Sequence, residues 1–317
     1  MSLLRGILRR GFSSAGWWIG DGVGRPRVLS GSRVGRTVDA SNTGSYRVGA
    51  LAFGAAAVAA ASVGVSGGLR TGLAWVSSEA AQPSPIQITL YAYEPCPFCN
   101  KVRAFLDFHR VQYRWVEVNP LSKKELSFSE YKKVPVAVIN GEQVNNSADI
   151  ILRVDGMLHE KNTTFSSEEE EKWFRWVDTW LVKLTPPNIY RTASESLQTF
   201  DYLTEVSNFS PWQKQSVRLV GATSMYFIGK RMKKKYGIED ERQALYSAVD
   251  NWIDALGQKD FLGGDTPNKA DLAVFGVLRS LRNFDTYADM MANTHVAGWY
   301  RRMEIAVGPS ARTEIFD

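Results

Sequence analysis

Two cysteines stand in the run Cys96-Pro97-Phe98-Cys99, and the 317-residue chain has no others. A Cys-x-x-Cys pair can supply a nucleophilic thiolate and a second thiol that resolves a mixed disulfide. Two cysteines and three histidines cannot build a disulfide-stapled scaffold or a four-cysteine zinc site, and they nearly exclude a Cys2His2 site. We therefore expect no metal site and look to the two thiols for the chemistry. A pair of purely structural thiols is the alternative.

The sequence on either side of the motif predicts how the thiols are placed. Residues 86–93, IQITLYAY, form an apolar, β-rich run that predicts a buried strand, and residues 100–109, NKVRAFLDFH, have helical spacing. Pro97 suits the first helical position, because its missing N–H would be unpaired there anyway. Cys96 then caps the helix, where free N–H groups and the positive end of the dipole stabilise a thiolate.

Three neighbours refine this expectation. Lys101 and Arg103 are expected to add positive charge beside the Cys96 thiolate. Cys99 lies one turn into the helix, so we expect it to be more buried and to act as the resolving thiol.

Further strands are expected downstream of the motif. Residues 112–118 alternate as a strand, and a Val134-Pro135 step opens another strand, VPVAVI. We expect a cis peptide bond at Val134-Pro135, with the Val134 backbone free to pair with an extended peptide. After a fourth strand, Asn146-Ser147 begins a helix, and a helix start with a hydroxyl is suited to bind a carboxylate.

The second half of the chain has the pattern of an all-helical unit. Acidic residues and then tryptophans at helical spacing predict a helix from Ser166 that Pro186-Pro187 ends, with the tryptophans packed in the core. Asn268 and Asp271 form a capping-box pattern before the apolar run LAVFGVL. We expect this pattern to serve folding rather than catalysis.

The first 85 residues differ from the rest in composition. Residues 1–48 carry eight Arg, no Lys and two Asp, and residues 48–69 contain no charge. This predicts a transit-like basic segment at 1–46, a membrane span at 47–70 and a linker at 71–85. From residue 83 onward, 29 basic side chains face 30 acidic ones, which argues against a nucleic-acid partner. A mitochondrial membrane location is expected, with the Golgi membrane, or the cytosol after processing, as alternatives.

The motifs together resemble a known superfamily. The order βαβ–ββα, with CPFC, Val-Pro and Asn-Ser at these positions, resembles the amino-terminal half of a glutathione transferase. The string YAYEPCPFCNKVRAFLDFH after an apolar segment resembles the membrane-associated prostaglandin E synthase type 2 family. The resemblance implies a thioredoxin-like α/β domain at 86–160 and an all-α, glutathione-transferase-like domain at 161–317. The Asn268 pattern resembles the folding motif of that helical domain.

The resemblance also implies an activity. In that family, a thiolate matching Cys96 isomerises prostaglandin H2, a lipid endoperoxide, to prostaglandin E2, and residues matching Tyr93 and Phe98 surround the nucleophile. The alternative is a glutathione-dependent thiol–disulfide oxidoreductase that uses Cys96 and Cys99 on a disulfide substrate. A third interpretation is a membrane-tethered binding module without catalysis, against which the intact CPFC argues.

Glutathione, or another thiol reductant, is the cofactor that the resemblance implies. The positions that match its binding residues are Val134, Pro135, Asn146 and Ser147. Asn146 replaces the acid that usually precedes Ser, so the partner for the glutamyl amine is changed. The family also binds haem together with glutathione, which makes haem a second candidate cofactor. The helical half offers a face for a homodimer.

Overall fold

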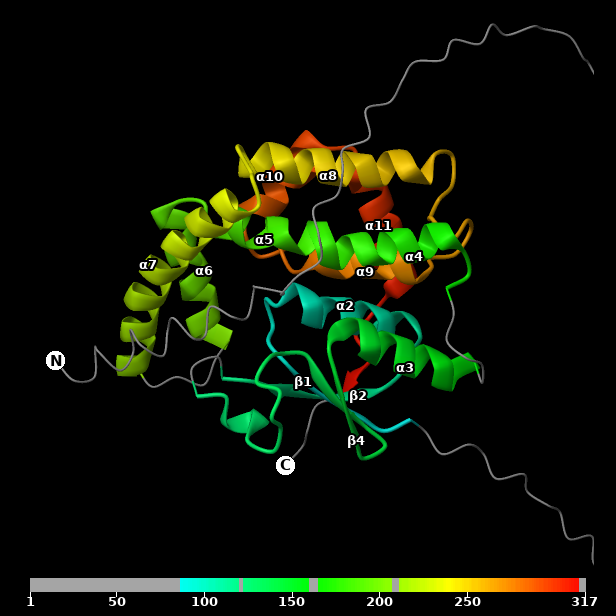
Figure 1. The fold of residues 1–317 in the computed structure, drawn as a ribbon, viewed down its shortest axis with the longest axis horizontal. Helices are drawn as coiled ribbons and strands as arrows, with labels where there is room; N and C mark the ends of the chain where they lie inside the picture. Colours follow the sequence, from blue (N-terminus) through cyan, green and yellow to red (C-terminus); the bar gives the residue numbers. More distant parts are fainter. Residues whose placement is uncertain (1–85, 120–121, 160–164, 207–210, 314–317) are drawn as a thin grey trace, which may run out of the picture. The chain divides into compact units, whose positions relative to one another are not determined.

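The computed structural model describes residues 86–119, 122–159, 165–206 and 211–313 (Figure 1). The transit-like segment 1–46, the membrane span 47–70 and the linker 71–85 that the sequence predicts lie outside these residues. Among the helices that the structure does describe, none combines the length and the apolar character that crossing a membrane requires.

A mixed sheet forms the first half of the described chain. Its strands, in spatial order, are β4 (Glu142–Asn145), β3 (Val136–Ile139), β1 (Ile88–Ala92), β2 (Tyr113–Glu117) and β5 (Arg312–Thr313). The central strand β1 runs parallel to β2 and antiparallel to β3, with Leu90 opposite Trp115 on one side and Ala137 on the other. These are the strands that the alternating apolar pattern predicts.

Strand β5 is an addition that the sequence did not reveal. It comes from the end of the chain and pairs in parallel with β2, where Tyr113 lies opposite Arg312. The buried carboxylate of Asp107 accepts the Ala311 N–H at 3.0 Å, and Thr313 Oγ1 donates to the Tyr113 carbonyl at 3.2 Å. A two-residue strand is too short to show an alternating apolar pattern, and its partners lie about 200 residues away in the sequence, so it could not be predicted.

Helix α2 (Pro97–Phe108) lies between the sheet and the helical half of the chain (Figure 1). Helix α3 (Ser147–His159) lies beside it, and helix α9 (Lys269–Arg279) packs against α2 from the other side. The backbones of α2 and α9 approach closely at Gly276, where a Cβ atom would lie 2.5 Å from the Asn100 carbonyl oxygen. Helix α2, which begins directly after Cys96, is therefore packed between the sheet and helix α9.

The second half is helical, as predicted, so the predicted fold class is confirmed. Its other elements are a helical run made of α4 (Glu168–Trp176), a π-helical turn (Val177–Leu181) and α5 (Val182–Ile189), then α6 (Ala193–Val206), α7 (Pro211–Lys235), α8 (Glu241–Leu256), α10 (Asp285–Asn293) and α11 (Val296–Val307). The tryptophans of α4 pack between helices as expected, since the Trp173 ring meets Trp252 edge-on at 5.4 Å. The capping box of Asn268 and Asp271 is present at the start of α9.

The prediction that Pro186-Pro187 ends the first long helix is wrong. Both prolines lie inside α5, which continues to Ile189. A proline at position 186 removes the N–H that would bond the Val182 carbonyl. The buried Thr185 hydroxyl donates to that carbonyl instead, at 2.9 Å. A local side-chain hydrogen bond therefore lets the helix pass through the proline pair.

This substitution of donors is testable. Replacing Thr185 by Val keeps the shape but leaves the buried Val182 carbonyl without this donor, so we expect unfolding to need about 1 kcal/mol less free energy. The matched control is Thr179→Val, because Thr179 makes the same kind of bond to the Arg175 carbonyl on an exposed surface. Urea denaturation followed by tryptophan fluorescence measures both. Equal stability of the two variants would contradict the compensating role of Thr185.

Candidate functional site

Both cysteines lie at the start of α2, and both are free thiols. Cys96 is the N-cap residue, with extended backbone angles, and Pro97 follows at the first helical position. Cys96 makes no capping hydrogen bond with its side chain. The placement predicted from the sequence is thus observed, but any stabilisation of a Cys96 thiolate comes from the free N–H groups and the helix dipole rather than from a formed cap.

Cys99, predicted to be the more buried thiol, lies beneath Cys96. Its side chain is fully buried, and it forms a hydrogen bond with the Cys96 side chain. Burial raises the pKa of Cys99 well above its ordinary value, and the hydrogen bond and charge of Cys96 raise it further. The two thiols therefore differ in kind, with Cys96 at the helix end and Cys99 beneath it.

Tyr93 holds both cysteines through its backbone. Its carbonyl accepts a hydrogen bond from the Cys96 N–H at 3.0 Å, and its own N–H donates a hydrogen bond to the Cys99 sulfur. Its side chain is half-buried against the core, as is that of Phe98 on the first turn of α2. The two aromatic residues predicted around the nucleophile thus lie on the segments that flank Cys96.

The prediction that Lys101 adds positive charge beside Cys96 is wrong. The charge of Arg103 is offset by a carboxylate. Lys101 is fully buried, and its Nζ lies 2.6 Å from an Asp178 carboxylate oxygen in the π-helical turn. Arg103 donates to Glu94 at 2.9 Å. Both cations are therefore neutralised by carboxylates that the sequence gave no reason to place there.

The sheet brings the predicted glutathione-binding residues to the same edge as Cys96. Val136 lies opposite Tyr91 of β1 on one side and Asn145 of β4 on the other. Consequently, Cys96 after β1, Pro135 before β3 and Asn146 after β4 leave the sheet at one edge. The Val134-Pro135 peptide bond is cis, as predicted, and the Val134 side chain is buried.

The start of α3 completes this edge. Asn146 has a φ of 70°, a left-handed conformation that asparagine tolerates better than most residues. Ser147 is buried, and its Oγ has no hydrogen-bond partner among the residues that the structure describes. A buried hydroxyl without a partner at a helix N-terminus is a ready donor for an anionic group.

Tyr131 is a residue at this edge that the sequence analysis missed. Burial raises its pKa, and the charges of Cys96 and of Asp149 on α3 raise it further. Its hydroxyl therefore lies within electrostatic reach of both Cys96 and α3. A tyrosine three residues before Val134-Pro135 could have been noticed as a second candidate beside Tyr93.

Comparison with known proteins agrees with this geometry. Residues 90–160 match the family "Glutathione S-transferase, N-terminal domain", and residues 235–302 match "Glutathione S-transferase, C-terminal domain". Prostaglandin E synthase 2 of Danio rerio is 39% identical over 268 residues, which cover 70% of this chain and 71% of that protein. The chain belongs to the prostaglandin E synthase 2 family. It is therefore an enzyme of this family, with the fold of a glutathione S-transferase.

A second curated relative gives the same assignment. Prostaglandin E synthase 2 of Mus musculus is 38% identical over 271 residues, covering 70% of this chain and 71% of that protein. Among solved structures, glutaredoxin 2 from Salmonella typhimurium in complex with glutathione is 21% identical, with a TM-score of 0.44, and covers 69% of this chain and 94% of that one.

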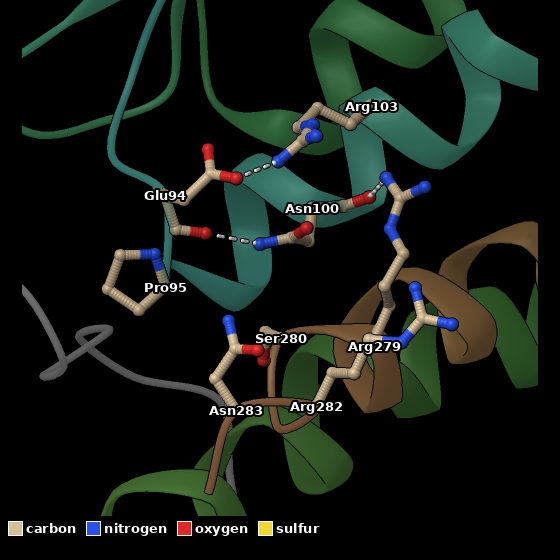
Figure 2. Close-up of a pocket in the computed structure, with 8 residues that line it drawn as sticks. All are labelled: Glu94, Pro95, Asn100, Arg103, Arg279, Ser280, Arg282 and Asn283. Carbon is tan, nitrogen blue, oxygen red and sulfur yellow. Dashed lines mark hydrogen bonds and ion pairs between the residues drawn. The ribbon is translucent and has the colours of Figure 1, made fainter. Parts of the chain in front are cut away.

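A polar pocket of about 270 Å³ opens beside the segment that leads into Cys96 (Figure 2). It is lined by Glu94, Pro95, Asn100, Arg103, Arg279, Ser280, Arg282 and Asn283. Asn100 Nδ2 donates to the Glu94 carbonyl at 2.8 Å, which fixes this segment (Figure 2). Of these residues only Arg103 was expected near Cys96 from the sequence, because α2 and the end of α9 meet only in the folded chain.

Proposed function

We propose that this member of the prostaglandin E synthase 2 family isomerises prostaglandin H2 to prostaglandin E2 with Cys96 as the nucleophile. The observation that carries the proposal is the conjunction of 39% identity to a protein of that name with a free thiol at the start of α2. A cysteine at such a position is a suitable nucleophile, because the helix end favours its thiolate.

The reaction balances without an external oxidant. The Cys96 thiolate attacks the endoperoxide oxygen on C9, so that a sulfur–oxygen bond forms and the oxygen–oxygen bond breaks. The oxygen on C11 takes a proton and becomes a hydroxyl. Loss of the proton from C9 then forms the 9-keto group, and the sulfur leaves as the Cys96 thiolate.

A second function is favoured by one observation that isomerisation does not require. Cys99 is a free thiol hydrogen-bonded to Cys96, which is the arrangement needed to resolve a mixed disulfide. We infer that a glutathione-linked thiol–disulfide oxidoreductase is the alternative activity of the same site. Assays of prostaglandin H2 turnover and of glutathione-dependent disulfide reduction, run side by side on one preparation, distinguish the two.

Glutathione is the ligand that fits the edge near Cys96. The residues expected to hold it are the Val134 backbone for its cysteinyl part, and Ser147 with the N-terminus of α3 for its γ-glutamyl carboxylate. The partnerless Ser147 hydroxyl supports this assignment, because a native buried hydroxyl normally has a partner. Bound there, glutathione would supply a thiol for resolving a disulfide on Cys96.

Ser147→Ala tests this fit. We expect the Kd for glutathione to rise about tenfold, because a hydrogen bond to a charged carboxylate is lost. The free energy of unfolding without glutathione should not fall, since the hydroxyl bonds no residue in the described part of the chain. Titration calorimetry and urea denaturation measure the two quantities, with Ser127→Ala on the exposed surface as the control. Unchanged glutathione affinity would remove Ser147 from the site.

Haem does not fit as a group held by a histidine of this chain. His109 and His159 face each other, with ring centroids 6.0 Å apart, at the end of α2 opposite Cys96. Burial lowers the pKa of His109 to about 4. His295 lies at the start of α11 and bonds Asp250. None of the three stands near the thiols, and we derive no step through haem.

A further inference from the structure

The burial of Cys99 creates a need for a proton acceptor. A cysteine attacks as a thiolate, so Cys99 must lose its proton before it can resolve a mixed disulfide on Cys96. Its side chain is 0% exposed, and burial holds its pKa well above the ordinary value. Bulk water cannot take this proton directly, and a group of the protein has to do so.

Glu117 ends strand β2 directly opposite Ala92, four residues before Cys96. Its carboxylate accepts hydrogen bonds from Trp115 Nε1 at 2.9 Å and from the Glu94 N–H at 3.3 Å. Burial nevertheless raises the pKa of Glu117 to about 7. A carboxyl group that titrates near neutral pH can both accept and release a proton under working conditions.

The backbone segment between β1 and α2 contacts both Glu117 and Cys99. Two consecutive N–H groups point at the two side chains, that of Tyr93 at the Cys99 sulfur and that of Glu94 at a Glu117 oxygen. Glu117 and Cys99 are therefore held by adjacent residues of the same segment. The charge of Glu117 accordingly raises the pKa of Cys99.

The other charges around Glu117 leave it able to act as a base. The charge of Glu94 raises the pKa of Glu117, and that of Arg312 on β5 lowers it. The guanidinium of Arg103 on α2 is bound to Glu94. Glu94, whose N–H bonds Glu117, also lines the polar pocket (Figure 2).

We propose that Glu117 is the base that takes the proton from the Cys99 thiol, directly or across one water molecule, when Cys99 resolves a mixed disulfide on Cys96. The inference rests on the dithiol function proposed above. The Cys99 thiolate attacks the Cys96 sulfur, the Cys96–Cys99 disulfide forms, and the bond from Cys96 to the substrate sulfur breaks. The substrate leaves as a thiolate that is protonated, and the disulfide substrate is the oxidant. Glutathione thiols reduce the enzyme disulfide afterwards.

The test separates the two thiol steps in the full chain. Reduced protein is mixed with an aromatic disulfide whose released thiol is coloured, so that a first phase reports attack by Cys96 and a second reports resolution by Cys99. In the wild type we expect the second rate to rise with pH and level off above about pH 7, because the ionised form of Glu117 is the base. In Glu117→Gln this inflection should vanish, and the rate at neutral pH should fall about 100-fold.

Two controls distinguish proton transfer from a structural role. The first phase should be unchanged in Glu117→Gln, because attack by Cys96 does not use Glu117. The single Gln oxygen can accept one of the two N–H groups, which bond different oxygens of Glu117, so urea denaturation of this variant checks that its fold persists. Glu125→Gln is the matched variant, because Glu125 also accepts a backbone N–H, that of Asn119, and should match the wild type in both phases. A second phase in Glu117→Gln with the wild-type rate and pH profile would overturn the role of Glu117 alone. Absence of both phases in the wild type would overturn the dithiol function itself.

Discussion

Cys96→Ser is expected to abolish prostaglandin E2 formation and glutathione-dependent disulfide reduction together, by about 1,000-fold or more. A serine hydroxyl at the start of α2 stays protonated at neutral pH, so it cannot replace the thiolate that both reactions use as the nucleophile. The side chain is nearly isosteric and makes no capping bond that would be lost. The fold should therefore persist, and rates measured on both substrates report chemistry rather than unfolding.

Cys99→Ser is the matched control, and its outcome depends on which function operates. Isomerisation needs one thiol, so prostaglandin E2 formation should stay within a few-fold of the wild type. Disulfide reduction should become dependent on glutathione concentration, because glutathione must then resolve the mixed disulfide on Cys96. If Cys96→Ser retains either activity in full, Cys96 is not the nucleophile of that reaction. If Cys96→Ser lowers disulfide reduction but not prostaglandin E2 formation, the isomerase proposal fails.

Features encoded by a few adjacent residues were predictable from the sequence. The helix start at Cys96 follows from Pro97 and an apolar period, and the capping box at Asn268 follows from residue types three positions apart. The meeting of Pro135 and Ser147 with Cys96 was predictable only through the family resemblance. Strand register, which places them at one edge, is a property of pairing between strands.

Features that depend on distant partners could not be predicted in this way. From the sequence, Lys101 is expected to be a cation beside a thiolate. In the structure it is paired with Asp178 of the π-helical turn, which lies 77 residues later in the sequence. The sequence did not single out Glu117, because its partners, the Trp115 indole and the Glu94 N–H, are known only from the folded chain. A carboxylate or ammonium group in a sequence has no fixed role until its solvent exposure and its partner are known.

The largest effect on stability is expected at Asp271, which is fully buried at the start of α9. Its carboxylate accepts the N–H groups of Leu262, Gly263 and Asn268 at 3.0–3.2 Å and the indole N–H of Trp299 at 3.2 Å. Asp271→Ala leaves these donors without their acceptor. Each buried unpaired donor costs about 1–3 kcal/mol, so we expect the free energy of unfolding to fall by about 4 kcal/mol or more.

Urea denaturation of the full chain measures this loss of unfolding free energy. Asp265→Ala is the control, because Asp265 lies on the same loop but is exposed. Its replacement should change the free energy of unfolding by less than about 0.5 kcal/mol. The consequence reaches the thiols, since the Gly276 backbone of α9 packs directly on Asn100 and Lys101 of α2. We therefore expect the activity of Asp271→Ala to fall in proportion to the fraction of folded protein. In Cys96→Ser, by contrast, activity should be lost while the protein stays folded. A stable Asp271→Ala protein, within about 1 kcal/mol of the wild type, would show that α9 does not depend on this carboxylate.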